Sequence, residues 1–307
     1  MKSGINKVTF ISQGVNLSGL LFTPENFDES KMYPTIVFSG PFNQIKEQMG
    51  SEYGKAFAET GYVFLAFDHV GYGDSEGEIR NFENGEWKKE GIRDAISYLR
   101  TLAFVDKDRL FGIGGCASGG YMPLVAVTDK RLKAIATVSG MNNNTLSYFE
   151  SMSKEQMIQM LTIANEARQR MYETGQIEYI DALGYEGIDP ITLPEGASRE
   201  GYDYYMTERA GTAKYPNYSH RSLANILEYA PLLDATLFAK YIYMPFIGVV
   251  GEHADTAIMT KNFYEAALEP KAYVEVEGAT HVSLYDNQEH IKVAVEKIDE
   301  FFKEQVK

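Results

Sequence analysis

Near the middle of the chain, an apolar run rich in glycine, Leu110–Gly115, leads into a turn of small residues and then a helical stretch. This pattern predicts a buried strand that turns sharply into a helix and holds one reactive side chain at the apex, a nucleophile elbow. The residues two before and two after the apex must be small, because larger side chains would strike the neighbouring backbone. Cys116 fits the apex, with Gly114 before it and Ser118 after it.

Two registers of the elbow are compatible with these residues. In Gly114-x-Cys116-x-Ser118 the nucleophile is Cys116, and in Cys116-x-Ser118-x-Gly120 it is Ser118. We favour Cys116 because it directly follows the apolar run, where the turn is expected, and Ser118 stays open as the alternative.

Buried strands are predicted on both sides of the elbow, separated by helical patterns. The strands are 35–38, 62–67, 110–113, 134–138, 246–250 and 272–276, and a hairpin is expected around Gln13-Gly14. The helices are 47–59, 86–102, 121–127, 257–268 and 287–304. This alternation predicts an α/β fold, with a mostly parallel central sheet flanked by helices.

One segment interrupts the alternation. Residues 141–240 lack a strong strand pattern, include a helical stretch at 154–173, and hold ten of the 21 tyrosines and six of the 12 methionines. A segment of this length is too long for a loop, so we expect a mainly helical cap inserted between core parts at 1–140 and 241–307. Its aromatic and methionine content suggests an adaptable apolar pocket, with Tyr202, Tyr204, Tyr205 and His220 as candidates for substrate binding.

Composition narrows the classes of partner. The net charge of −14 argues against nucleic acid and anionic membranes, which are polyanions. The single cysteine allows no internal disulfide, residues 1–7 lack the apolar core of a signal peptide, and no apolar run reaches membrane-spanning length. A cytoplasmic protein is expected, and its oligomeric state, including a homo-oligomer, is left open.

A nucleophile at an elbow needs a base and a carboxylate that orients the base, in the chain order nucleophile, acid, histidine. His281 follows the last predicted strand and precedes the final helix, where the base belongs. Asp255 and Glu252 both follow the strand 246–250, and we favour Asp255 as the acid with Glu252 as the alternative. We expect no metal or organic cofactor.

The oxyanion hole requires two backbone N–H groups. One is expected from Ala117, the residue after the nucleophile, and the other from the turn after strand 35–38. Pro41 in that turn has no N–H, so Phe42 is the expected donor. We expect Lys46 and Glu47, which follow in the sequence, to be solvated charges at the start of a helix.

Together these features resemble the α/β-hydrolase superfamily over nearly the whole chain. The elbow is similar to the Gly-x-Cys-x-Gly-Gly of dienelactone hydrolase, except that Ser118 precedes the paired glycines. A closer similarity is to YcjY-like bacterial hydrolases and fungal polyketide transferases, over the segments 46–48, 67–68, 71–75, 202–205, 251–256 and 278–286. The resemblance implies an enzyme fold and a triad, but no particular substrate.

The sequence therefore predicts a hydrolase that cleaves a small-molecule ester, thioester or lactone through an acyl-enzyme on Cys116, with His281 as base and Asp255 as acid. A thiolate is a good nucleophile toward activated acyl groups, which favours these substrates over amides. Two alternatives stay open: an acyltransferase of the same fold, and a binding protein that has lost the chemistry.

Overall fold

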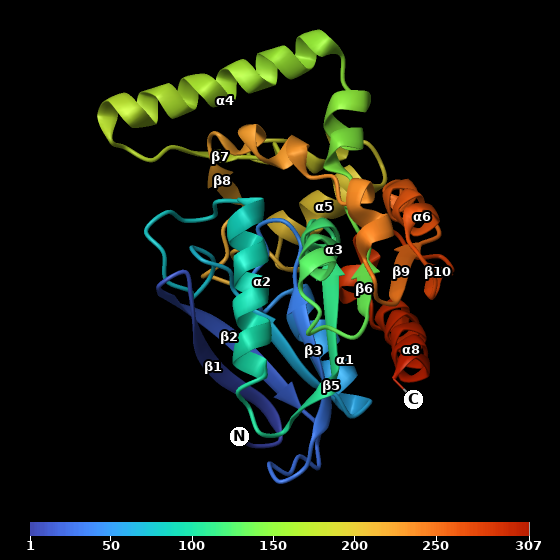
Figure 1. The fold of residues 1–307 in the computed structure, drawn as a ribbon. Coiled ribbons are helices and arrows are strands. Elements are labelled where there is room, and N and C mark those ends of the chain that lie inside the picture. Colours follow the sequence, from blue (N-terminus) through green and yellow to red (C-terminus); the bar gives the residue numbers. More distant parts are fainter. Residues whose placement is uncertain (307) are drawn as a thin grey trace.

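The computed structural model describes residues 1–306, so Lys307, the last residue of the predicted core, lies outside the described residues. Its centre is a sheet of eight strands in the order β1-β2-β4-β3-β5-β6-β9-β10 (Figure 1). β1 and β2 form an antiparallel hairpin, β2 pairs antiparallel with β4, and the other neighbours are parallel. The strands are β1 (Gly4–Ser12), β2 (Val15–Thr23), β3 (Tyr33–Ser39), β4 (Val63–Phe67), β5 (Val105–Gly115), β6 (Ile135–Val138), β9 (Phe246–Gly251) and β10 (Lys271–Val276).

Helices cover both faces of this sheet. Two buried clusters lie on its opposite faces: α1 and α8 contribute to one, and α2, α3 and α6 contribute to the other. The helices are α1 (Met49–Glu59), α2 (Gly85–Leu99), α3 (Ser118–Thr128), α6 (Ala257–Ala266), α7 (Ser283–Asp286) and α8 (Gln288–Gln305). The predicted α/β fold with a mostly parallel sheet is confirmed.

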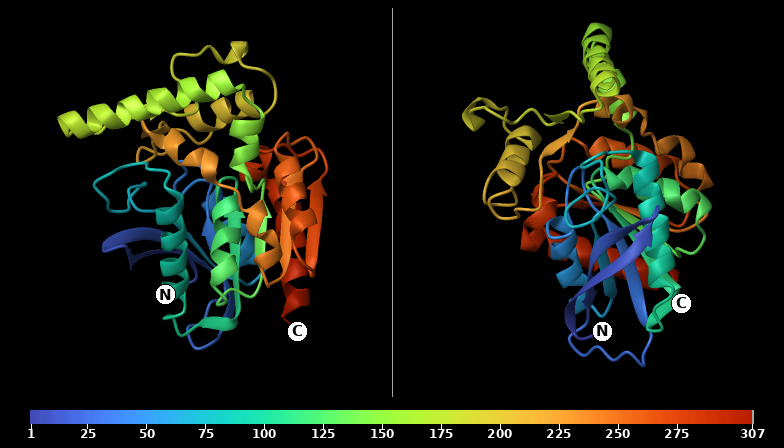
Figure 2. Two further views of the ribbon diagram at one scale, coloured as in Figure 1. Left: turned by 45° about the horizontal axis from the view of Figure 1, so that its top comes forward. Right: turned by 90° about the vertical axis from the view of Figure 1, so that its left-hand side faces the viewer.

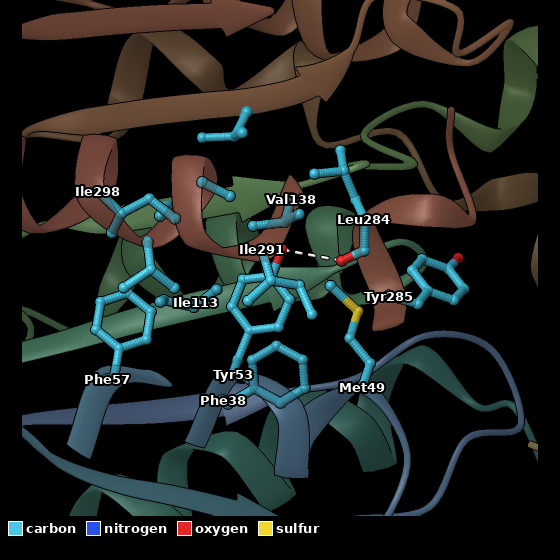
Figure 3. Close-up of a cluster of buried hydrophobic side chains, with 14 of the residues drawn as sticks. Phe38, Met49, Tyr53, Phe57, Ile113, Val138, Leu284, Tyr285, Ile291 and Ile298 are labelled. Carbon is cyan, nitrogen blue, oxygen red and sulfur yellow. Dashed lines mark hydrogen bonds between the residues drawn. The ribbon is translucent and has the colours of Figure 1, made fainter. Parts of the chain in front are cut away.

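The core also fixes the short helix α7 in place. Figure 3 shows Tyr53 of α1 between Phe38 of β3 and Leu284 of α7. The Tyr53 ring stacks on Phe38, with centroids 6.1 Å apart, and its hydroxyl donates to the Leu284 carbonyl at 2.9 Å. Because Leu284 and Tyr285 are both buried in α7, this contact helps to hold the following side chain, Tyr285, against the centre of the molecule.

The segment 139–245, between β6 and β9, lies beyond the carboxyl ends of the parallel strands (Figure 1). Its long helix α4 extends away from the sheet in both views of Figure 2. The sequence shows no strong strand pattern here, yet the structure has a two-stranded antiparallel sheet, whose strands of three residues are too short to produce one. The segment contains a π-helical turn (Leu146–Glu150), α4 (Lys154–Thr174), β7 (Tyr179–Asp181), α5 (Ala197–Met206), β8 (Arg221–Leu223) and 3-10 turns at Pro190–Thr192, Ile226–Glu228, Ala230–Leu232 and Thr236–Tyr241.

Among residues 1–306, every helix is too short or too polar to cross a membrane.

Candidate active site

Cys116 occupies a strained turn between β5 and α3. Its φ is +47°, in the left-handed region that residues with a Cβ rarely adopt. The turn is held by the Cys116 N–H, which donates to the Val138 carbonyl at 3.0 Å, and by the Cys116 carbonyl, which accepts from the Gly119 and Met141 N–H groups at 2.8 Å. Such strain persists where the surroundings enforce it, and it is common where a side chain must be presented for chemistry.

A close backbone contact requires glycine at position 114, and a side chain from outside α3 completes the first turn of that helix. A Cβ at Gly114 would lie 2.1 Å from the Ser118 carbonyl oxygen, so only glycine fits there. Pro123 lies inside α3 and has no N–H for the Gly119 carbonyl four residues earlier. The buried Asn142 side chain donates to that carbonyl instead, at 2.7 Å. The first turn of α3 is therefore completed by a residue that follows β6.

The Cys116 thiol lies against two backbone donors. Burial raises the pKa of the thiol, and contacts with the Tyr285 hydroxyl and with the N–H groups of Phe42 and Ala117 partly offset this increase. These are the two N–H groups expected for an oxyanion hole. The raised pKa means that the resting side chain is a neutral thiol, so a base must remove its proton before it can attack.

A buried ion cluster holds the loop that carries Phe42. Lys46 is 3% exposed, and its Nζ lies 2.6 Å from Asp68, 2.7 Å from Asp74 and 2.9 Å from Glu47. The prediction that Lys46 is a solvated charge at a helix start is wrong, because α1 begins only at Met49 and the chain before it folds onto the buried carboxylate after β4. The cluster ties the loop after β3 to the loop after β4.

Tyr285 lies between the thiol and the imidazole. Its hydroxyl contacts Cys116 and is 2.8 Å from His281 Nε2, while His281 Nδ1 is hydrogen-bonded to Thr256 Oγ1. Burial raises the pKa of Tyr285 well above its ordinary value, so the phenol stays protonated and can donate. The four groups form a continuous chain from thiol to hydroxyl to imidazole to hydroxyl.

The two carboxylates proposed to orient His281 differ in their surroundings. Burial lowers the pKa of His281 to about 4, and the charge of Asp255 opposes this decrease. Glu252 instead accepts a hydrogen bond from the Gly278 N–H at 2.8 Å and helps to hold the turn before His281. Asp255 therefore acts on the imidazole through its charge, and the hydrogen-bond partner of Nδ1 is the next residue, Thr256.

Ser118 lies beneath the elbow in a polar network that is buried from solvent. It is fully buried, and its hydroxyl donates to the Gly40 carbonyl at 2.6 Å and lies 2.7 Å from Ser39 Oγ. Ser39 in turn lies 2.8 Å from His69 Nε2. Ser118 is also the first residue of α3 rather than the apex of the turn.

A cavity of about 690 Å³ reaches this chain of groups. Cys116, His281, Tyr285 and Thr256 line it together with Phe42 and Ala117. Much of its remaining wall is apolar and comes from the 139–245 segment, which contributes Met141, Met152, Met160, Ile163, Leu183 and Leu227. The structure thus brings the predicted nucleophile, base and oxyanion donors to one largely apolar cavity.

Of the four predicted substrate-binding residues, Tyr205 lines this cavity. Tyr204 is buried beside it and packs against Tyr285, with ring centroids 5.2 Å apart, but lies outside the lining. Tyr202 packs on Tyr185, which lines the cavity, and His220 is hydrogen-bonded to Glu186 at 2.7 Å, but neither Tyr202 nor His220 is part of the lining.

The sequence assigned no role to Tyr285, Thr256 or Glu83, all of which line the cavity. A signal for Tyr285 was available, because it follows His281 by four residues and lies just before the predicted final helix. Thr256 is adjacent to the predicted acid. Glu83 precedes α2 with no motif around it, so only the tertiary structure brings it to the cavity.

Among residues 1–306, no group of three or more His, Cys, Asp or Glu side chains is arranged to hold a metal ion.

Comparison with known proteins supports the fold and the family. The model for X-Pro dipeptidyl-peptidases of the S15 family matches residues 13–188. The uncharacterised protein YcjY of Escherichia coli is 33% identical over 97% of this chain and 98% of its own length. The uncharacterised protein PA2218 of Pseudomonas aeruginosa is 30% identical over 97% of this chain and 80% of its own. A crystal structure of PA2218 matches with a TM-score of 0.87 over 99% of this chain and 94% of that chain.

A more distant relative carries a named activity. A thiohydrolase of Eupenicillium brefeldianum is 25% identical over 68% of this chain and 64% of its own length. With the S15 model matching more than half of the residues and YcjY matching along nearly the whole length, the chain belongs to the α/β-hydrolase (Peptidase_S15-like) family.

Proposed function

We propose that this hydrolase cleaves a small-molecule ester, thioester or lactone through an acyl-enzyme on Cys116. The observation that carries the proposal is the single hydrogen-bonded chain from the Cys116 thiol through Tyr285 to His281, at the wall of an apolar cavity. The thiol also lies at the N–H groups of Phe42 and Ala117. An acyl carbonyl beside this thiol would have donors for its developing negative charge.

In the first step, the sulfur of Cys116 forms a bond to the acyl carbon as its proton leaves. The Tyr285 hydroxyl accepts this proton and gives its own to His281 Nε2, so that the imidazole gains one proton overall. The carbonyl oxygen becomes an oxyanion held by Phe42 and Ala117 N–H groups. The tetrahedral adduct then expels the alcohol or thiol leaving group, which takes the proton from the imidazolium.

In the second step, a water molecule attacks the acyl carbon of the thioester formed with Cys116. His281, neutral again, accepts a proton from this water. The tetrahedral adduct then breaks its C–S bond and releases the carboxylic acid, and the sulfur takes the proton back from the imidazolium. This mechanism uses the tautomer in which His281 Nδ1–H donates to the Thr256 hydroxyl, because Nε2 is then free to accept a proton from Tyr285. The charge of Asp255 stabilises the imidazolium that forms between the steps.

Thioesters and activated esters fit this site better than amides. The pKa of Cys116 is raised and that of His281 is lowered to about 4, so transfer of the thiol proton to the imidazole is uphill in the resting enzyme. The substrate carbonyl must therefore be reactive by itself and its leaving group good. The thiohydrolase name of one relative agrees with an acyl thioester substrate for this chain.

Mass spectrometry of the intact protein tests the proposal. A short acyl thioester and a p-nitrophenyl ester should each add one acyl group, and peptide mapping should locate it on Cys116. Cys116→Ala should carry no acyl group, whereas Ser118→Ala should still be acylated. Acylation at Ser118, or no acylation and no turnover with any ester or thioester, would overturn the assignment.

A further inference from the structure

Glu83 is a buried carboxylate in the wall of the cavity. Its side chain is 2% exposed, and its Oε2 accepts from the Tyr72 hydroxyl at 2.8 Å and lies 3.2 Å from Lys88 Nζ. Its other oxygen, Oε1, is buried and accepts no hydrogen bond of ordinary geometry from residues 1–306, and the hydroxyl of Tyr121, which also lines the cavity, interacts with the same carboxylate. Glu83 and Tyr121 line the cavity, whereas Lys88 and Tyr72, the partners of Oε2, do not.

Asn144 presents a second acceptor of the same kind. Its Nδ2 donates to the Ala230 carbonyl at 3.1 Å, which fixes the orientation of the amide. Within residues 1–306 the buried Oδ1 has no hydrogen-bond partner, and the residue lines the same cavity. The two acceptors belong to elements that meet, because Phe82, beside Glu83, packs on Tyr229, beside Ala230, with ring centroids 5.0 Å apart.

Unpaired acceptors in an apolar cavity are costly, and they point to a ligand that donates hydrogen bonds. The charge of Glu83 is already balanced by Lys88 at 3.2 Å. A cationic ligand would therefore leave a net positive charge inside a wall of methionine, leucine and isoleucine side chains, which is unfavourable. A neutral hydroxyl group satisfies Oε1 and adds no charge.

The position of Glu83 indicates which part of the substrate carries this hydroxyl. Glu83 follows β4, whereas His281 follows β10 at the far end of the strand order, and Cys116 follows β5 between them. The leaving group departs on the side of His281, which gives it a proton. The wall with Glu83 is thus on the side where the acyl group of the substrate binds. The charge of Glu83 is close enough to raise the pKa of both Cys116 and Tyr148.

We propose that the acyl group of the substrate carries a hydroxyl that donates to Glu83 Oε1, so that this enzyme selects hydroxylated acyl chains over unsubstituted ones. Asn144 Oδ1 is a second acceptor for a polar group on the same chain. This inference rests on the proposed function, because it names the substrate class for the Cys116 site. Glu83 and Asn144 bind the acyl group and take no part in the chemical steps.

The test compares matched p-nitrophenyl esters with acyl chains of equal length, unsubstituted or carrying one hydroxyl at successive carbons. The wild-type kcat/KM should be at least about tenfold higher for the best hydroxylated ester, because the unsubstituted chain leaves a buried acceptor unpaired. In Glu83→Gln/Lys88→Met, which removes the buried ion pair as a unit, this ratio should fall severalfold or more.

The matched control is Glu86→Gln/Lys89→Met, which removes an ion pair of 2.7 Å on the solvent side of the same helix and should keep the wild-type ratio. If the first double variant does not fold, Glu83→Asp retracts the carboxylate while keeping its charge, and the ratio should again fall. A wild-type ratio near one at every hydroxyl position, or a preference that survives both Glu83 changes, would overturn the inference.

Failure of the proposed function is a separate outcome. If no ester or thioester is turned over, binding of the corresponding amides of hydroxylated and unsubstituted acids, measured by calorimetry, decides the inference without any chemistry. Tighter binding of the hydroxylated amide that depends on Glu83 would support hydroxyl recognition in a protein that is not a hydrolase of these esters. Equal binding of the two amides would reject it.

Discussion

Two chains of polar groups lie on either side of the elbow, and each has a thiol or hydroxyl, a second hydroxyl and an imidazole. In one, Cys116 contacts Tyr285, which contacts His281. In the other, Ser118 contacts Ser39, which contacts His69. The residue types alone would allow either chain to activate a nucleophile.

Their surroundings separate them. The Cys116 chain lines the cavity, and the second nitrogen of His281 is bonded to Thr256 near the charge of Asp255. The Ser118 chain is buried, and the Nδ1 of His69 has no hydrogen-bond partner in the described part of the chain, residues 1–306. Burial holds the pKa of His69 well below its ordinary value. The imidazole of His69 can neither contact a substrate nor be stabilised as a cation, so we assign it a structural role. Access to the cavity and the nearby charge therefore distinguish the Cys116 chain from the Ser118 chain.

The largest expected effect comes from removing the side chain of the proposed nucleophile. Cys116→Ala should lower ester turnover at least about 1,000-fold, because it removes the atom that forms the acyl bond. Ser118→Ala should keep turnover within about tenfold of wild type, since its hydroxyl makes only structural hydrogen bonds. A spectrophotometric ester assay measures both, and similar losses in the two variants would remove the distinction between the chains.

Removal of the Tyr285 hydroxyl should have the next largest effect. Tyr285→Phe keeps the ring but breaks the path from Cys116 to His281, and kcat should fall about 100-fold, in the range that proton transfer by a positioned group contributes. Tyr204→Phe is the matched control, because this ring packs on Tyr285 yet lies outside the cavity lining. An unchanged kcat in Tyr285→Phe would mean that His281 reaches the thiol directly once substrate binds.

The pH profile tests the imidazole. The neutral form of His281 is the base, and its pKa of about 4 means that it stays neutral as the pH falls well below 6.5. The acid limb of kcat/KM should therefore lie near pH 4, provided that the protein stays folded there, which circular dichroism at each pH checks. A limb near pH 6.5 would contradict the assignment of a buried imidazole as the base.

Asp255→Asn should lower turnover about tenfold, less than the roughly 10⁴-fold loss for an acid bonded directly to the imidazole of a serine triad. It should also move the acid limb to lower pH, because the Asp255 charge raises the pKa of His281. Glu252→Gln is the control and should leave the limb in place, since its carboxylate is bonded to the Gly278 N–H. A shift in Glu252→Gln alone would reassign the acid.

The smallest effect on activity is expected when the buried chain of Ser118, Ser39 and His69 is altered. Such a change should lower the stability of the protein instead. Ser118→Ala leaves the buried Gly40 carbonyl and Ser39 hydroxyl each without one partner, so the free energy of unfolding should fall by about 1–3 kcal/mol. Chemical denaturation of wild type and variant measures the difference. A variant as stable as wild type would show that the network beneath the elbow is dispensable.

The comparison also shows what a sequence can predict. The elbow follows from local spacing, because Gly114 and the small residues after Cys116 satisfy a steric requirement of the turn itself. The sheet and its long flanking helices follow from apolar periodicity, whereas short elements such as β7, β8 and α7 were not predicted. These features depend on neighbours in the chain and can be read without the tertiary structure.

The cavity depends on contacts between distant parts of the chain, and there the sequence was less informative. Aromatic content pointed to Tyr202, Tyr204, Tyr205 and His220, of which Tyr205 lines the cavity. The buried pairing of Lys46 with Asp68 joins residues 22 apart and has no local pattern. The buried position of the Glu83 carboxylate at the cavity, with Oε1 lacking a hydrogen-bond partner among residues 1–306, likewise has no local sequence pattern and is seen only in the folded structure.

The bond from Asn142 to the Gly119 carbonyl has a consequence for exchanging segments between relatives. Pro123 leaves that carbonyl without its helical partner, and the amide that replaces it comes from the beginning of the 139–245 segment. A graft that brings a foreign segment but joins it before Asn142 would remove this donor from beneath the nucleophile. Chimeras should therefore be joined after Asn142, so that the scaffold retains its own amide and only the substrate-facing part is swapped.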